Sequence, residues 1–69
     1  MTTFFEANQV RLILKMKLYQ YGWYNDCCVV TSADGSDYTV LVSVRRVDNI
    51  IRQIVTSRMR GVTIKLKVD

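Results

Sequence analysis

Apolar and polar residues alternate in two segments of this chain. Residues 10–18 read Val-Arg-Leu-Ile-Leu-Lys-Met-Lys-Leu, and residues 62–68 read Val-Thr-Ile-Lys-Leu-Lys-Val. Successive side chains of a β-strand point to opposite faces, so each segment would present one apolar face and one cationic face. Neither segment contains a carboxylate. The alternation predicts strands near residues 9–20 and over residues 62–68.

The first of these segments also has features of a helix. Thr3 and Glu6 have the spacing of a capping box, which is typical of a helix start. On a helix, however, the apolar residues between 10 and 16 would spread around most of the circumference. We therefore predict a helical turn near residues 3–8 followed by the strand, and keep a helix over residues 3–20 as the alternative.

The middle of the chain has the pattern of a β-hairpin. Residues 27–32 and 38–44 are rich in strand-forming residues and flank an Asp-Gly pair at 34–35. Asp-Gly is favoured in two-residue type I′ turns, where both central residues have positive φ. Such a turn would place Val29 opposite Val40 in an antiparallel pair.

A helix is predicted over residues 49–60. Asp48 precedes it as an N-cap, and Gly61 follows it in the place where a left-handed residue commonly ends a helix. The apolar face of this helix comprises Ile50, Ile51, Ile54, Val55 and Met59. We expect this face to cover the apolar side of the sheet.

Together these elements predict a single α+β domain over residues 1–69. The order β-β-β-α-β gives a two-layer sandwich, in which one main helix covers a mostly antiparallel four-stranded sheet. The spatial strand order would be 4-1-2-3, because a helical crossover brings the last strand parallel to the first. With residues 3–20 helical, the order of elements becomes α-β-β-α-β.

The composition argues against an enzyme and against a bound metal or cofactor. The chain has no histidine, so the commonest general base near neutral pH is missing. Its two cysteines, Cys27 and Cys28, are adjacent and would point to opposite faces of a strand. This arrangement forms no ordinary disulfide and fits no zinc-ligand spacing. We expect no catalytic residue, no metal and no cofactor.

The sequence predicts a cytoplasmic protein that does not engage a membrane. No apolar run approaches the roughly 18 residues of a membrane-spanning helix. The first residues lack the basic and apolar regions of a secretory signal. A domain of this size has a marginal core, so we expect self-association, as a homodimer, to bury further surface.

A formal net charge of +4 suits an anionic partner. With the two alternating segments as neighbouring strands, their cations would share one face without a carboxylate, and aromatic residues would extend that face. Sheets bind single-stranded nucleic acid with such cations along the phosphate backbone and with exposed rings stacked on bases. The predicted nucleic-acid-binding residues are Arg11, Lys15, Lys17, Tyr19, Tyr21, Trp23, Lys65 and Lys67. A competing interpretation is that the lysines only keep exposed strands solvated and unpaired.

The alternative function is a protein–protein interaction module. The segment 38–44 carries no charge and would form an edge of the predicted sheet, where another strand can add. The partner would be a second copy of the chain or a larger protein, as for a small viral or accessory protein that docks on or inhibits a host complex. The predicted interface residues are Tyr38, Val40, Leu41, Val42 and Val44.

Overall fold

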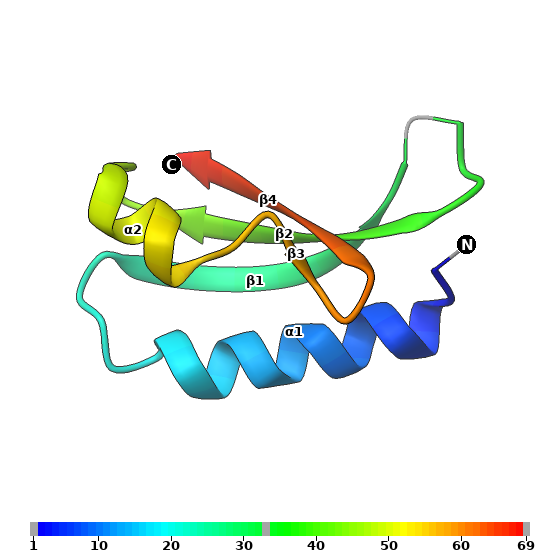
Figure 1. Cartoon of the computed structure of the whole chain (residues 1–69), viewed down its shortest axis with the longest axis horizontal. Helices are drawn as coiled ribbons and strands as arrows, with labels where there is room; N and C mark the ends of the chain where they lie inside the picture. The colour runs from blue at the N-terminus through cyan, green and yellow to red at the C-terminus, as the bar shows by residue number, and fades with distance from the viewer. Residues whose placement is uncertain (1, 33, 69) are drawn as a thin grey trace.

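The computed structural model describes residues 2–32 and 34–68, which form a two-layer α+β fold (Figure 1). The elements are α1 (Phe4–Leu18), β1 (Tyr24–Thr31), β2 (Tyr38–Val44), α2 (Asn49–Ile54), β3 (Arg58–Met59) and β4 (Val62–Val68). Helix α1 forms one layer and a mixed four-stranded sheet forms the other. The predicted α+β class is confirmed, whereas several elements and the strand order differ from the prediction.

The predicted strand near residues 9–20 is wrong, because this part of the chain belongs to α1. The alternative, a helix over residues 3–20, is correct to within a few residues. Thr3 caps the helix: the Glu6 N–H donates to the Thr3 hydroxyl at 3.1 Å, and the Thr3 N–H donates to the Glu6 carboxylate at 3.0 Å. This reciprocal pair satisfies two of the amides that a helix start leaves unpaired.

Burial of one side of α1 decides in favour of the helix. The buried residues of α1 are Ala7, Val10, Leu14 and Leu18. Their spacing of three or four residues keeps them on one side of the helix. The strand-like alternation in the sequence arises because Leu12 and Met16, on the opposite side of α1, are also apolar.

The core lies between α1 and the inner face of the sheet. The centre of this face consists of three residues of β2, Val40, Val42 and Val44, which are completely buried. The rest of the sheet and the region around α2 add Cys27, Ile51, Val55, Val62 and Ile64. Burying an aliphatic side chain of this size contributes about 1.5–3 kcal/mol, so the contact of α1 with β2 is a major source of stability.

Strand β2 is central, and the sheet has the order β1-β2-β4-β3. It pairs antiparallel with β1 and parallel with β4. The predicted order 4-1-2-3 is therefore wrong, and so is the prediction that residues 38–44 form an edge. No strand precedes β1 within the described residues, so the returning strand β4 pairs with β2 instead. The predicted strand over residues 62–68 is confirmed.

The helix predicted over residues 49–60 is shorter than expected and ends at Ile54. Asp48 caps it as predicted, since the Ile51 N–H donates to the Asp48 carboxylate at 2.8 Å. The chain is extended at Val55 and then returns as the β3–β4 hairpin. Because α2 has so few residues, α1 rather than α2 covers the sheet, and Ile50 stays exposed.

The turn of the β3–β4 hairpin explains why the helix stops early. Arg60 and Gly61 have φ values of 53° and 79°. Two consecutive residues with positive φ are the requirement of a type I′ hairpin turn. Gly61 is left-handed as predicted, but it closes a hairpin rather than ending a helix.

The β1–β2 hairpin has the predicted register and a different turn. Val29 lies opposite Val40, as predicted. The Ser32 N–H donates to the Asp37 carbonyl at 2.8 Å, so strand pairing ends at Ser32 and Asp37 and the loop is longer than Asp34-Gly35 alone. Only Gly35 of that pair has positive φ, and Ala33 lies outside the described residues. The register is unchanged because both loops have the same centre.

Asp37 joins this hairpin to the start of the chain. Its carboxylate accepts hydrogen bonds from the N–H groups of Thr2 at 2.7 Å and Tyr38 at 2.9 Å. These backbone donors, first that of Tyr38 and then that of Thr2, hold the pKa of the Asp37 carboxyl below its ordinary value. The Phe4 ring packs edge-to-face on Tyr38 at the same place.

Strand β1 forms one edge of the sheet, and a carboxylate covers part of that edge. The side chain of Asp26 accepts a hydrogen bond from the Cys27 N–H at 2.8 Å. The Ser32 N–H is directed at the neighbouring strand. Backbone groups of alternate residues face that strand, so the N–H groups of odd-numbered residues such as Cys27 point away from it. One donor on the open side of β1 is thereby occupied within the chain.

We expect Leu14→Ala to lower the free energy of unfolding by about 2–5 kcal/mol, because it leaves a cavity in the contact of α1 with the sheet. Leu12→Ala on the same helix removes the same atoms from a side chain that is 45% exposed and should cost about 1 kcal/mol or less. Urea denaturation followed by far-UV circular dichroism measures both values. Equal losses would contradict the assignment of the inner side of α1.

We expect Asp37→Asn, which keeps an acceptor but removes the charge, to lower stability near neutral pH. The difference from the parent protein should shrink as the pH falls from about 5 to about 2. A carboxyl whose pKa is lower in the folded chain contributes stability above its unfolded pKa of about 3.9, and this contribution is lost as the pH falls through the folded value. Urea midpoints across this range provide the measurement, and a difference independent of pH would disprove the effect.

Candidate anion-binding face

The structure separates the two groups of cations that the sequence predicted on one face. Arg11, Lys15 and Lys17 are on α1, whereas Lys65 and Lys67 are on β4. The expected single basic surface therefore does not form, because the first alternating segment is a helix. The two lysines of β4 are exposed on a strand whose inward residues, Val62 and Ile64, are buried.

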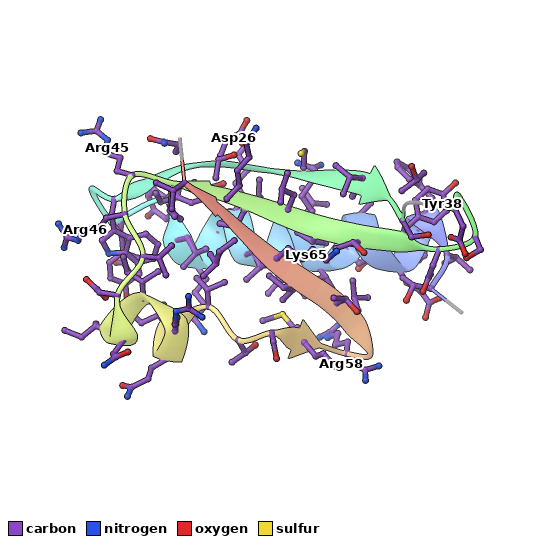
Figure 2. All side chains as sticks on the ribbon, turned by 90° about the horizontal axis from the view of Figure 1, so that it is seen from above. Asp26, Tyr38, Arg45, Arg46, Arg58 and Lys65 are labelled. Atoms are coloured by element: carbon purple, nitrogen blue, oxygen red, sulfur yellow. The ribbon has the colours of Figure 1, made fainter. Side chains whose placement is uncertain are left out.

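The face of the sheet opposite α1 is open (Figures 1 and 2). Side chains alternate along each strand, so the residues between the buried ones point to this face. Strand pairing aligns Cys28, Leu41 and Lys65 in one row across β1, β2 and β4. The next row consists of Asp26, Ser43 and Lys67. We call these two rows the open sheet face.

A groove runs along the outer side of β4, next to the open sheet face. It has a volume of about 660 Å³, and its lining residues come from β4 and from the segment 47–57. Those with polar side chains are Arg52, Thr56, Ser57 and Lys65. The Ile64 N–H donates to the Ser57 carbonyl at 2.8 Å and closes one end of the groove. Beyond this bond, alternation directs the N–H and C=O of Leu66 into the groove.

The groove is cationic because the carboxylates of the described residues lie elsewhere. Its lining contains Arg52 and Lys65, and no Asp or Glu of the described chain contributes to it. Lys67 follows two residues after Lys65 on the same strand face. Consecutive residues of one strand face are about 7 Å apart, so these two ammonium groups can meet neighbouring anionic groups of an extended chain.

The described carboxylates mostly hold the chain ends and turns together. Hydrogen bonds from Ser32 and Ser36 keep the pKa of Asp34 low, and bonds from Thr3 lower the pKa of Glu6. Asp48 accepts from the Ile51 N–H, which is the main cause of its lowered pKa. Asp48 also forms an ion pair with Arg46 at 3.3 Å. These carboxylates are therefore held at hydrogen-bonded positions outside the groove.

The predicted aromatic residues do not extend the open sheet face. Tyr21 and Trp23 stack on each other, with ring centroids 4.9 Å apart and an interplanar angle of 17°, and both are half-buried against the core. Tyr19 is exposed at the end of α1. Base stacking on Tyr21 or Trp23 would require this pair of rings to separate.

All five predicted interface residues belong to β2, which is central, so they do not form an exposed edge. Val40, Val42 and Val44 are completely buried in the core, and Tyr38 packs against it. Leu41 is half-buried on the open sheet face between Cys28 and Lys65.

Two further cations near this region were missed from the sequence. Arg52 lines the groove from α2, and exposed Arg45 directly follows β2 at the end of the sheet (Figure 2). The Arg45 N–H donates to the Trp23 carbonyl at 2.8 Å, which fixes the backbone there. Arg45 continues the odd-numbered series of β2, a signal that the sequence did contain. The position of Arg52 depends on the length of α2 and was not available from the pattern.

Comparisons with known proteins identify no relative of this chain. No family model matches it, and no curated protein or solved structure shows significant similarity. Within residues 2–32 and 34–68, no helix has both the length and the apolar character needed to cross a membrane. In the same residues, no group of three or more cysteine or carboxylate side chains comes together in a way that could hold a metal ion.

The two cysteines should differ in reactivity. Cys27 is buried, and its thiol donates to the Arg11 carbonyl at 3.4 Å, whereas Cys28 is exposed on the open sheet face. We expect a thiol reagent such as Ellman's reagent to modify Cys28 rapidly in the native protein and Cys27 only on unfolding. Cys28→Ser should abolish the fast phase. Two thiols that react at equal rates would contradict the placement of β1.

Proposed function

We propose that this protein is a non-catalytic binding module that holds the phosphate backbone of single-stranded nucleic acid. The ligand would lie across the open sheet face and along the groove beside β4. The observation that carries the proposal is the groove itself, whose lining includes Arg52 and Lys65 and no carboxylate among the described residues. Lys67 lies two residues further along the same face of β4, in the next row, and continues the positive charge.

The lining chemistry supports phosphate contacts more than base recognition. Lysine and arginine neutralise phosphates irrespective of sequence. The Ser57 hydroxyl and the Leu66 N–H are additional donors on the groove side. The Thr56 hydroxyl also lines the groove but donates to the Arg58 carbonyl at 2.8 Å. Because Tyr21 and Trp23 stack on each other, stacking on bases contributes little. Binding should therefore be weak, sensitive to salt and nearly independent of sequence.

A second candidate is docking of an extended acidic segment of another protein. The observation in its favour is the outer edge of β4, where Leu66 directs its backbone groups into the groove next to Arg52 and Lys65. A strand that adds to such an edge gains main-chain hydrogen bonds, and acidic side chains would meet the cations. Both candidates use the same groove, so one titration can separate them.

We expect a fluorescently labelled oligo-dT to bind with an affinity that falls as salt rises, measured by fluorescence anisotropy. Three contacting cations predict a slope of about −2 for the logarithm of the association constant against the logarithm of the salt concentration. Lys65→Gln/Lys67→Gln should bring this slope close to about −0.7, because a single contact then remains.

The matched control is Arg11→Gln/Lys15→Gln, which removes the same charge from α1 and should leave the slope unchanged. Equal effects of the two double variants would show that only net charge matters and would refute the site. Absence of oligo-dT binding at low salt would refute it as well. If a poly-glutamate peptide binds more tightly than oligo-dT, and Lys65→Gln/Lys67→Gln weakens that binding, the acidic-segment candidate replaces the nucleic-acid one.

A further inference from the structure

Helix α1 carries a second apolar stripe on the side that faces away from the sheet. The residues of this outer stripe are Phe5, Gln9, Leu12, Met16 and Tyr19. Their spacing of four, three, four and three residues is that of helices that pair with other helices. Its apolar members are exposed to 69% (Phe5), 45% (Leu12), 73% (Met16) and 71% (Tyr19).

The outer stripe lies directly opposite the buried residues of α1. At about 100° per residue, Leu12 is on the far side of the helix from Val10 and Leu14. This placement explains why α1 has almost no net amphipathic character. A helix that is apolar on both sides is normally covered on both sides, and within the described residues only the inner side of α1 packs against the sheet.

We propose that a second copy of this chain covers the outer stripe, with the two α1 helices antiparallel about a two-fold axis near Leu12. Phe5 and Tyr19 are each seven residues from Leu12, or about 10 Å along the helix. A two-fold axis at Leu12 therefore places Tyr19 of the second copy over Phe5, and the reciprocal contact follows by symmetry.

The surface next to Phe5 has room for this tyrosine. A hollow of about 290 Å³ lies between the start of α1 and the β3–β4 turn, and its lining residues are Phe5, Glu6, Gln9 and Arg60. A tyrosine ring from the second copy would contact Phe5, and its hydroxyl would reach the polar rim of the hollow. Aromatic rings with one polar end favour such positions in interfaces. The outer stripe therefore borders the hollow, through Phe5 and Gln9, and carries the ring that would fill it.

Charge favours the antiparallel direction. In this arrangement the first turn of α1, which carries Glu6, lies beside the last turn of the second copy, which carries Lys15 and Lys17. The Lys17 ammonium itself donates to the Ile54 carbonyl of its own chain at 3.4 Å. The helix dipoles are also opposed. In a parallel pair the last turns of both helices, which carry Lys15 and Lys17, would lie side by side, and like charges at one end of a helix pair are unfavourable.

The exposed area of the outer stripe predicts a reversible dimer rather than a permanent one. An aromatic side chain offers roughly 150–250 Å², of which most is exposed for Phe5 and Tyr19. With Leu12 and Met16, the pair of copies would bury on the order of 800–1,000 Å² in total, which is the low end for specific interfaces. We expect a dissociation constant on the order of micromolar. The open sheet faces point away from this contact, so the inference does not rest on the proposed function.

The test is sedimentation equilibrium without nucleic acid over a wide range of protein concentration. The parent chain should show a concentration-dependent monomer–dimer equilibrium. Leu12→Glu places two carboxylates at the two-fold axis and should raise the dissociation constant at least about thirtyfold. The matched control is Ile50→Glu, which alters a side chain exposed to 68% on α2 and should leave the equilibrium unchanged. Circular dichroism confirms that both variants fold.

Cysteine cross-linking in a Cys28→Ser background tests the direction of the helices. Leu12→Cys should form an intermolecular disulfide with itself. Phe5→Cys should not link to itself but should link to Tyr19→Cys when the two proteins are mixed. Self-linking of Phe5→Cys would establish a parallel pair and overturn the arrangement. A parent protein that remains monomeric at millimolar concentration, or an Ile50→Glu variant that dissociates as readily as Leu12→Glu, would overturn the dimer itself.

Discussion

The packing of α1 against the inner face of the sheet determines the rest of this fold. Leu14 and its neighbours on the inner side of α1 cover Val40, Val42 and Val44, and these residues form the centre of the core. Because α1 covers one face of the sheet, the other face stays open. The alternating apolar and cationic residues of β4 then have one stable orientation, in which Ile64 points into the core and Lys65 points to the open face. A hydrophobic contact thus decides where positive charge is displayed.

The carboxylates of the described chain serve mainly local structure, and none of them pairs directly with the cations of β4. Asp26 shares a row with Lys67 but is separated from it by Ser43. Glu6 and Asp48 cap helices, Asp34 stabilises the hairpin loop, and Asp37 joins that loop to Thr2. Each of these groups accepts hydrogen bonds from backbone amides, which favours its charged form. The positive surplus of the sequence is therefore distributed unevenly over the folded molecule, and the groove beside β4 lies on its cationic side.

The sequence predicted the elements whose patterns have a single interpretation. The alternation of 62–68 located β4 and the shared face of Lys65 and Lys67, and Asp48 marked the start of α2. The hairpin register was also correct, because it depends only on the centre of the loop. Helix α1 was misassigned because Leu12 and Met16 make its outer side apolar, so helical and strand periods overlap there. The groove depends on where α2 ends and on the pairing of β4 with β2, and neither follows from local pattern.

The hydrogen bond between Asp26 and the Cys27 N–H has a consequence for solubility at high concentration. Edge strands are the usual starting points of amyloid-like stacking, because their unpaired N–H and C=O groups can form hydrogen bonds with the backbone of a further chain. On β1 a new chain would have to displace the Asp26 carboxylate from this amide and lie against its negative charge. This carboxylate therefore acts as a gatekeeper that disfavours fibril growth along β1, while a helix such as α1 can still pair without exposing any backbone amide.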